Sequence, residues 1–309
     1  MAAVIGGIGI SHTPSMGLEY DRGTASSGGF SPRWQPWYDG TRRVEELLER
    51  LAPDHLIVVY NDHLNHFDLD NYPTLAIGVG ARFPQADEGW GPRDLPDLEG
   101  DTRWGLHLTE ELIGREFDLT VSQDLAIDHG VFSWLPYVFR QTGDSTGDST
   151  SGDMAGGWPV TVTPIAVNMV RQPLPTANRL RSLGQAIRAS VAAFPGDDRV
   201  VVIATGGMSH QISGARFGMA NEDLDRYFLR NLPGNLDELV SVPVREYMRL
   251  GGTEAAELTL WFAMRAALSE RAAAVYTFQT VPAITGCGAL VMAEPGALPG
   301  TGPGSEAGS

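Results

Sequence analysis

Four of the seven histidines in this 309-residue chain occupy the same kind of position, shortly after an apolar, strand-like run. His12 follows VIGGIGIS, His63 follows LIVVYND and His210 follows VVVIATGGMS, while His129 comes after FDLTVS and the short loop QDLAID. A single polar residue after a strand is most often an ordinary loop residue. In open α/β sheets, however, functional groups gather beyond the carboxyl ends of the strands, so we expect these four side chains to form one cluster.

A cluster of this kind could bind a metal ion. Two neutral imidazoles and one carboxylate form the ligand set of non-haem Fe(II) enzymes, which leaves positions open for a substrate and O2. Glu257 is the best-placed carboxylate, because it stands in a helical stretch beside Leu258 and Trp261. Glu254, one turn earlier, is an alternative, although an acid near a helix N-terminus is also favoured by the helix dipole. The same ligand set suits Zn2+ with bound water, so a zinc hydrolase also remains open.

The other three histidines lack this placement. We expect His55, His66 and His107 at the surface or in local packing. The spacing of His63 and His66 resembles a metal-binding pair on a helix, but the asparagine and aspartate residues around them favour a turn.

The opening segment GGIGISHTP, residues 6–14, places three glycines before His12. It does not fit a dinucleotide-binding fingerprint, because the histidine occupies the position of the third glycine. Pro14 and the glycines that follow argue against a helix directly after the segment, so no helix N-terminus is expected to face a phosphate. We interpret the segment as a buried strand with a tight end, which delivers Ser11 and His12.

The composition excludes several functions. The net charge is −16 and the pI is about 4.7, which disfavours nucleic acid and anionic membranes as partners. All 22 basic residues are arginines, so a lysine Schiff base, a Walker lysine and a Ser–Lys dyad are excluded. Cys287 is the single cysteine, so neither an intramolecular disulfide nor a cysteine-rich zinc site can form. We find no signal peptide and no apolar run of membrane-spanning length, and expect a cytoplasmic protein.

Strand-like and helical runs alternate along the chain, which predicts a single α/β domain with a central mixed or parallel sheet flanked by helices. The predicted metal site lies beyond the carboxyl ends of its strands. Strands are expected over Val4–Ile10, Leu56–Tyr60, Thr74–Val79, Phe117–Ser122, Val160–Asn168 and Arg199–Ala204. Helices are expected over Arg42–Leu51, Leu106–Arg115, Asn178–Phe194, Asn221–Leu232 and Glu254–Ser269, the last with Thr253 as its N-cap.

Two segments are too polar or too rich in glycine and proline to join a core. Residues 142–157 contain TGDS twice and predict a flexible surface insertion. Residues 295–309, PGALPGTGPGSEAGS, predict a disordered tail. No other boundary divides the chain, so residues 1–294 are expected to form one catalytic domain.

Several long motifs match a known family. The segments ISHTP, VVYNDHLNHFDLDNYPTLAIGVG, ADEGWGPR, IDHG, ATGGMSHQISGARFG and GTEAAELTLWFAMRAAL resemble class III extradiol ring-cleavage dioxygenases, in particular the catalytic β subunits of protocatechuate 4,5-dioxygenases. The resemblance extends over about residues 1 to 293. It implies an Fe(II) enzyme that opens the ring of a catechol with O2 to give a semialdehyde, without a reductant or an organic cofactor.

The resemblance also implies roles for individual residues. His12 and His63 match the two histidine ligands of Fe(II), and Glu257 matches the carboxylate ligand. His210 matches the catalytic acid/base, a role that suits imidazole because it titrates near neutral pH. His129 matches a further histidine near the substrate and O2.

The chain departs from the protocatechuate enzymes in two places. The insertion at residues 142–157 is longer here, and we interpret it as a neutral loop. In PAITGCGAL, residues 282–290, Ile284 replaces the serine of a polar Ser-Asn-Thr run that helps to hold the substrate carboxylate, and the segment is one residue shorter. This change predicts a less polar pocket and a neutral or bulkier catechol, such as an aryl-, alkyl- or steroid-derived one. We expect Cys287 in this loop to be a small packing residue.

Partners and alternative functions follow from the same resemblance. The protocatechuate enzymes use a small α subunit that covers the site, and no such domain is fused here, so we expect a homo-oligomer or a separate small chain. A 2-aminophenol is an alternative substrate, since an amine can replace one hydroxyl as a donor to iron. A non-catalytic binding protein is a further alternative, and the joint presence of all three ligand matches and His210 argues against it.

Overall fold

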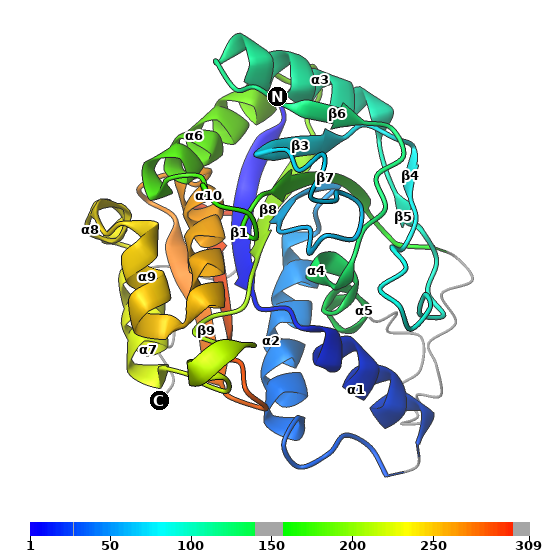
Figure 1. The fold of residues 1–309 in the computed structure, drawn as a ribbon. Helices are drawn as coiled ribbons and strands as arrows, with labels where there is room; N and C mark the ends of the chain where they lie inside the picture. Colours follow the sequence, from blue (N-terminus) through cyan, green and yellow to red (C-terminus); the bar gives the residue numbers. More distant parts are fainter. Residues whose placement is uncertain (27, 140–156, 299–309) are drawn as a thin grey trace.

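The computed structural model describes residues 1–26, 28–139 and 157–298, which form a three-layer α/β fold with one sheet between two helical layers (Figure 1). Within these residues, eight strands make up the sheet. Their spatial order is β6 (Thr120–Ser122), β3 (Leu75–Gly78), β7 (Thr161–Val167), β2 (His55–Tyr60), β8 (Arg199–Thr205), β1 (Ala3–Ile10), β10 (Cys287–Ala293) and β9 (Ala273–Thr280). The predicted α/β class, with a mixed sheet flanked by helices, is confirmed.

Helices cover both faces of the sheet, and each layer has its own apolar core. One layer contains α3 (Thr102–Gly114), α6 (Ala177–Ala193), α7 (Glu222–Asn231), α8 (Leu236–Ser241), α9 (Val244–Gly251), the 3-10 segment η3 (Thr253–Leu260) and α10 (Trp261–Ala266). The other contains α1 (Pro14–Ala25), α2 (Gln35–Leu51), α4 (His129–Phe132) and α5 (Leu135–Val138). The remaining elements are the 3-10 turn η2 (Gly214–Arg216) and the small ribbon of β4 (Arg82–Phe83) and β5 (Leu98–Glu99).

The centre of the sheet is parallel. The four strands β7, β2, β8 and β1 pair in parallel, so their carboxyl ends lie at one edge of the sheet. Every residue of β2 is buried, as expected for a continuous apolar run between two helical layers. This edge is where the sequence placed His12, His63 and His210.

The flanks of the sheet are antiparallel to its centre. β10 runs antiparallel to β1, β9 runs antiparallel to β10, and β3 runs antiparallel to β7. β6 pairs in parallel with β3, so it also runs against the central strands. The sequence prediction contains neither β9 nor β10. β9 is an edge strand of half-exposed and exposed residues without a two-residue alternation, so hydrophobic periodicity gives no signal for it.

The glycines of the opening segment lie inside β1, and the prediction that they form a tight strand end was wrong. A Cβ atom at Gly9 would overlap the ring of Trp261, and one at Gly7 would overlap the side chains of Met264 and Leu268. The absent side chains therefore let α10 pack directly on the sheet. The strand itself and its delivery of His12 agree with the prediction.

A helix begins directly after this strand, contrary to the prediction. The helix α1 has Thr13 as its N-cap, and the Thr13 hydroxyl accepts a hydrogen bond from the Met16 amide at 3.2 Å. Pro14 occupies the first turn, where a missing N–H costs nothing and the fixed φ of proline fits the helix. Proline in this position starts a helix, whereas the prediction took it as a helix breaker.

The predicted helix Glu254–Ser269 is two elements. Residues 253–260 form the 3-10 segment η3, and the α-helix α10 follows at residues 261–266. The N-cap is Gly252, with φ of 100°, and not Thr253. A Cβ atom at Gly252 would clash with the carbonyl group of His210, so this position requires glycine. An eight-residue 3-10 segment is unusually long, and such segments often mark functional sites.

The predicted insertion and tail fall mostly outside the described residues. Of residues 142–157, only the last is described, and residues 299–309 of the tail also lie outside. Residues 295–298 are described, and Leu298 is buried in the apolar core that also contains residues of α2 and α5. Among the described helices, none combines the length and the apolar character needed to cross a membrane.

Candidate metal centre

Three predicted ligands meet at the carboxyl edge of the parallel strands. His12 follows β1, His63 follows β2, and Glu257 lies in η3. The Nε2 atoms of His12 and His63 are 3.2 Å apart. The carboxylate of Glu257 completes the group, with Oε1 at 3.1 Å from Nε2 of His63 and Oε2 at 3.4 Å from Nε2 of His12.

The tautomer of His12 follows from its neighbours. Its Nδ1 lies 2.7 Å from the hydroxyl oxygen of Thr205, and that hydroxyl donates its proton to the carbonyl of Gly130 at 2.9 Å. Thr205 must therefore accept a hydrogen bond from Nδ1–H of His12, which leaves Nε2 without a proton in the neutral ring. Burial lowers the pKa of His12, although the charge of Glu257 acts in the opposite direction. A neutral imidazole with a free Nε2 lone pair is the form that binds metals.

His63 is held by a buried carboxylate. Its Nδ1–H and its backbone N–H both donate to Oδ2 of Asp128, each at 2.8 Å. Burial alone would lower the pKa of His63, but the charge of Asp128 and hydrogen bonds to Asp128 and Glu257 raise it well above the usual value. Burial alone would raise the pKa of Asp128, but His63 and His129 together lower it. The carboxylate therefore orients the ring so that Nε2 faces the other ligands, an arrangement common behind metal-bound histidines.

Glu257 is oriented from two sides. Its Oε1 accepts a hydrogen bond from the side-chain amide of Asn61 at 3.0 Å, and its Oε2 accepts one from the backbone N–H of Gly207 at 2.7 Å. Burial alone would raise its pKa, but His12 and His63 lower it well below the usual value. The charged form is therefore the stable one at this buried position.

These groups fit a cation. Both imidazoles direct nitrogen lone pairs into one small space that they share with an ionised carboxylate, and such acceptors repel one another unless a positive charge lies between them. The raised pKa of His63 has the same cause, because a proton on His63 can supply the positive charge in place of a metal ion. Of the two acidic candidates, Glu257 joins the group. The Oε2 atom of Glu254 instead accepts a hydrogen bond from the hydroxyl of Thr253.

His129 also joins this cluster, but not by the predicted route. Its ring stacks on His63 with centroids 4.1 Å apart, and one nitrogen of each of His12, His63 and His129 lies within 4.8 Å of the others. The preceding strand β6 runs against the central strands, so its carboxyl end points to the opposite edge. Residues 123–128 bring the chain back, and the bridge between Gln85 and Ile127 fixes this return.

A carboxylate that the sequence reasoning missed holds His129. Oε2 of Glu88 accepts a hydrogen bond from Nδ1–H of His129 at 2.6 Å, and Oε1 accepts one from its backbone N–H at 2.9 Å. Because Nδ1 is engaged, Nε2 is the nitrogen that remains available on the side of the cluster. Glu88 belongs to the quoted motif ADEGWGPR, but its partner lies 41 positions later, so spacing alone carried no signal.

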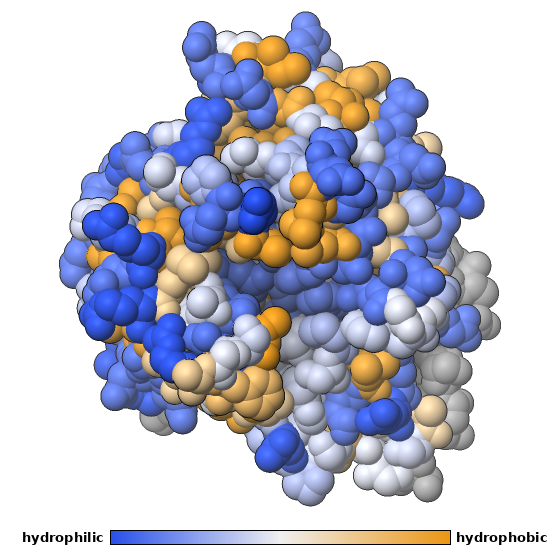
Figure 2. All heavy atoms as spheres, in the orientation of Figure 1, coloured by the Kyte–Doolittle hydropathy of each residue, from blue (hydrophilic) through white to orange (hydrophobic). Residues whose placement is uncertain are grey.

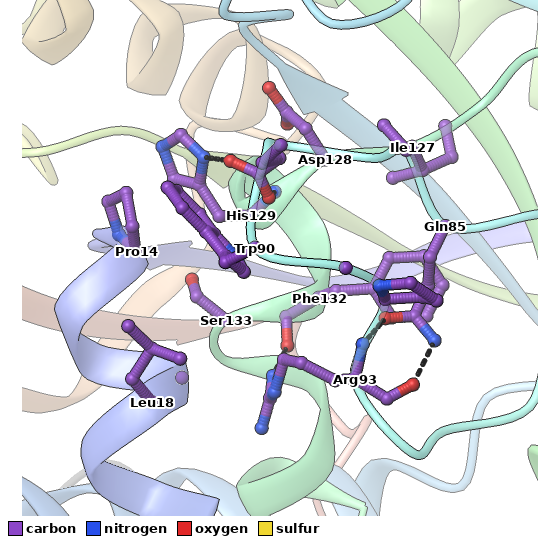
Figure 3. Close-up of a pocket in the computed structure, with 15 residues that line it drawn as sticks. Pro14, Leu18, Gln85, Trp90, Arg93, Ile127, Asp128, His129, Phe132 and Ser133 are labelled. Carbon is purple, nitrogen blue, oxygen red and sulfur yellow. Dashed lines mark hydrogen bonds and ion pairs between the residues drawn. The ribbon is translucent and has the colours of Figure 1, made fainter.

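A pocket opens beside His129 (Figure 3). Pro14, Leu18 and Trp90 line the pocket together with His129 (Figure 3), which gives the pocket a partly apolar wall. Arg93 also lines the pocket, but two of its guanidinium nitrogens form an ion pair with Asp21 and the third donates to the carbonyl of Phe132. Its charge is therefore already satisfied within the protein.

His210 lies on the turn after β8. Nδ1–H donates to the carbonyl of Met208 at 2.9 Å, so Nε2 is the free nitrogen. The ring lies against Gly207, where a Cβ atom would overlap it, and the N–H of Gly207 binds Glu257. His210 is not among the three histidines whose ring nitrogens lie within 4.8 Å of one another.

The remaining histidines form local contacts within the fold. His55 is buried at the start of β2, whereas Nδ1 of His66 accepts from the Ala126 amide and Nε2 of His107 lies 2.8 Å from the Ser190 carbonyl oxygen. The segment after His63 is a turn, as predicted. Cys287 is buried in β10, as expected for a packing residue, and burial raises its pKa.

The face of the molecule drawn in Figure 2 has a hollow with apolar edges. Figure 2 shows a recess of hydrophilic residues in the middle of this face, with hydrophobic residues along its edges. Six large apolar side chains near the predicted site residues are exposed by a third or more: Leu18, Leu64, Trp90, Ile212, Phe217 and Ile284. Ile284 adjoins Thr285, which forms a β-bridge with His210. Several of the side chains that neighbour the predicted site residues are therefore both apolar and exposed.

Fold and site together define the class of the protein: a three-layer α/β protein with two histidines and one carboxylate converging at the carboxyl edge of a parallel sheet. Residues 6–291 match the family described as the catalytic LigB subunit of aromatic ring-opening dioxygenase, and the chain belongs to this family. The resemblance to class III extradiol dioxygenases is thereby confirmed.

Two curated relatives illustrate the range of the family. Over 207 residues the chain is 36% identical to gallate dioxygenase of Pseudomonas putida, covering 67% of this chain and 57% of the relative. It is 29% identical over 212 residues to 2,3-dihydroxyphenylpropionate/2,3-dihydroxicinnamic acid 1,2-dioxygenase of Azotobacter vinelandii, covering 65% of this chain and 55% of that enzyme. The matches thus span little more than half the length of these relatives.

The fold also recurs in a solved structure. The crystal structure of an uncharacterized protein from Escherichia coli K12 superposes with a TM-score of 0.53 and 13% sequence identity, covering 93% of this chain and 98% of that one. At this identity the likeness concerns the fold alone.

Proposed function

We propose that the chain is a non-haem Fe(II) extradiol dioxygenase of class III, which opens the ring of a catechol-type substrate with O2 to a semialdehyde in aromatic catabolism. The observation that carries the proposal is the convergence of His12 Nε2, His63 Nε2 and the Glu257 carboxylate on one space. These would be the Fe(II) ligands, a set typical of non-haem iron oxygenases. Fe(II), when bound, supplies the Lewis acidity and the O2 chemistry that ring opening needs.

The two further histidines have separate roles in this proposal. Nε2 of His210 accepts a proton from a catechol hydroxyl and returns one later, because its Nδ1 is already bound to Met208. His129, held by Glu88, presents Nε2 to the substrate and O2 beside the cluster. Burial of His12 and Glu257 keeps their donor atoms in place before the substrate arrives.

The pocket supports a catechol with a neutral or apolar substituent. Among the described residues that line it, Arg93 is the basic side chain, and its charge is paired with Asp21. Ile284 stands beside the bridge partner of His210, where the protocatechuate enzymes carry a polar run. The relatives' names, gallate dioxygenase and 2,3-dihydroxyphenylpropionate/2,3-dihydroxicinnamic acid 1,2-dioxygenase, support an aromatic diol as the substrate class.

The exposed apolar side chains support an assembly. We propose a homo-oligomer in which a second copy of the chain covers the exposed Leu18, Ile212 and Phe217, because such side chains are stabilised by removal from water. A separate small subunit is the alternative occupant. Light scattering of the purified chain decides between them, since a monomeric chain contradicts the homo-oligomer.

The proposed function is tested by oxygen uptake. Protein loaded anaerobically with Fe(II) is offered protocatechuate, gallate, catechol, alkyl- and aryl-catechols and 2-aminophenol in parallel. We expect oxygen uptake and a yellow ring-opened product, fastest with the apolar catechols. Uptake with protocatechuate alone would contradict the substrate assignment. The activity itself would be refuted by iron-loaded protein that consumes no oxygen with any substrate, alone or with a small subunit.

The ligand assignment has its own test. In His12→Ala, one of the converging nitrogen donors is lost, so the protein should no longer hold stoichiometric iron after desalting. His107→Ala is the matched control, because this histidine contacts the Ser190 carbonyl of α6 and the rings of Trp104 and Phe194, and no residue of the cluster. His210→Ala should keep its iron and lose ring cleavage; if its iron is lost instead, His210 is a ligand.

A further inference from the structure

A buried carboxylate stands directly behind the turn that carries His210. Asp225 of α7 is fully buried, and the described residues provide no ion-pair partner for it. Its Oδ1 accepts a hydrogen bond from the backbone N–H of Ser209 at 2.8 Å, and its Oδ2 accepts one from the Ser209 hydroxyl at 2.7 Å. Both oxygens are therefore directed to the residue that precedes His210.

Ser209 connects three parts of the fold. Its hydroxyl oxygen accepts a hydrogen bond from the N–H of Asn221, the N-cap of α7, at 2.6 Å. Its carbonyl accepts one from the N–H of Gly286, just before β10, at 2.9 Å. The Asp225 carboxylate thus anchors a turn that is tied to both α7 and the segment leading into β10.

The ring of His210 depends on this turn. It folds back on residues 207–208, with Nδ1–H bound to the carbonyl of Met208 and the ring against Gly207. A change in the backbone at Ser209 therefore moves the ring, and with it the free Nε2. The other end of the turn is fixed separately, because Gly207 N–H binds Glu257.

Burying the charged carboxylate of Asp225 behind this turn costs desolvation free energy, and this cost argues that the charge has a function. Burial raises the pKa of Asp225 to about 6, although the two hydrogen bonds from Ser209 lower it. Glu222, one turn earlier on α7, adds to the increase, and the buried thiol of Cys287 on β10 also interacts with the carboxylate. A neutral amide could hold the turn at less desolvation cost. The ionised carboxylate offers stronger, shorter hydrogen bonds, which hold the turn more rigidly.

We propose that Asp225 is a positioning residue for His210. Acting through Ser209, its carboxylate keeps Nε2 of His210 where it can exchange a proton with the substrate. The inference rests on the proposed acid/base role of His210. It assigns to α7, which contributes no residue to the cluster, an indirect influence on the rate of ring opening.

The test compares three variants of Fe(II)-loaded protein. In Asp225→Ala, kcat should fall by about 100-fold, the scale on which a misplacement of ~1 Å costs rate, with KM and iron content near those of the wild type. Asp225→Asn should recover part of this loss, because its amide can still pair with both Ser209 groups. Asp223→Asn is the matched control, since Asp223 is an exposed acid on the same helix that pairs with Arg226.

The pH profile separates positioning from simple stability. As pH falls through about 6, Asp225 gains a proton and becomes a weaker acceptor, so kcat of the wild type should decline there. Asp225→Asn should show a lower plateau without this acid limb. A purely structural anchor would lower the amount of folded, iron-loaded enzyme and leave kcat per iron and its pH dependence unchanged, which would overturn the proposal.

A second readout does not depend on activity. In protein loaded with diamagnetic Zn2+, the Cε1–H signal of His210 is identified by its loss in His210→Gln. We expect this signal to move in Asp225→Asn and to stay in place in Asp223→Asn. If the iron-loaded wild type shows no ring-cleavage activity, the proposed function is refuted. If the chemical shift of the His210 Cε1–H signal is unchanged in Asp225→Asn, the positioning by Asp225 is refuted.

Discussion

The two ends of β2 carry histidines in opposite environments. His55 is the first residue of the strand, and its two ring nitrogens lie 2.7 and 2.9 Å from the hydroxyl oxygens of Thr161 and Thr163. Its ring stacks on Trp104, with centroids 4.9 Å apart. His63 follows the other end of the strand and meets the carboxylates of Asp128 and Glu257.

His55 is fully buried, whereas the side chain of His63 is 23% exposed, and the partners of each ring decide its chemistry. Burial lowers the pKa of His55 to about 3, and the charge of Asp101 offsets only part of this effect. Burial acts on His63 in the same direction, but the two carboxylates overcome it and raise its pKa. An imidazole buried between hydroxyl groups is therefore a packing element, whereas an imidazole held by carboxylates needs a positive charge, which a proton or a metal ion can supply.

The largest expected effect comes from a substitution at the His63 end of β2, called here the cluster end. His63→Ala should abolish stoichiometric iron binding and lower ring cleavage at least about 1,000-fold, because one of three proposed ligands is lost. Metal analysis after anaerobic loading and oxygen uptake measure both quantities. Retention of iron by this variant would mean that His63 does not bind the metal.

The next effect concerns the His55 end of β2, called here the packing end, and the pH dependence of the free energy of unfolding. The unfolded chain binds a proton at His55 near pH 6.5, while the folded protein resists it down to about pH 3. Stability from this residue is therefore fully present above pH 6.5 and is lost as pH falls, by about 3 kcal/mol between pH 7 and pH 4.

Urea unfolding at several pH values measures this loss. His55→Asn should lack the corresponding slope, whereas His107→Asn should keep it, since His107 is only half-buried. Parallel stability–pH curves for the wild type and His55→Asn would contradict the assignment. Iron binding should be unchanged in His55→Asn.

An intermediate effect tests the charge behind His63. Asp128→Asn keeps the shape of the side chain and removes its charge, so iron affinity should fall about 10- to 100-fold, as for other groups that orient metal-bound histidines. Activity should return at high Fe(II) concentration. Competition with a metal-sensitive dye measures the affinity, and an unchanged dissociation constant would show that the charge of Asp128 has no part in binding.

The smallest effects come from a matched pair of threonines. Thr163 contacts His55 at the packing end, and Thr205 contacts His12 at the cluster end. Thr163→Val should lower the free energy of unfolding by about 1 kcal/mol and leave iron binding unchanged. Thr205→Val should instead weaken iron binding, by about 10-fold, because it frees the ring of His12. Equal effects of the two variants on both properties would remove the distinction between the ends.

Much of the fold was predictable because its signals are local. The run LIVVY indicates a strand covered on both faces, and the amphipathic helices α2, α3, α6 and α7 appear near their predicted positions. The errors also have local causes. Pro14 was taken as a breaker although it suits a first turn, and Gly252 caps η3 through a positive φ that no sequence pattern reveals.

The site was predictable in its residues and not in its contacts. His12, His63 and His210 follow parallel strands, whose carboxyl ends meet at one edge, so their placement after strand-like runs was enough to group them. His129 reaches the same cluster although β6 runs the other way, so the argument from strand ends does not explain its position. Its partner Glu88 comes from a loop that no periodicity describes.

The sequence by itself determined the class of fold, the acidic and lysine-free surface, and the set of residues from which a metal site could be made. These properties depend on residue types and on spacings within one strand or helix. Only the tertiary structure decided which nitrogen of each histidine is free and which histidine stays neutral. Those choices depend on Thr205, Asp128 and Thr163, which lie far along the chain from the rings they contact, and folding alone brings such groups within hydrogen-bonding distance.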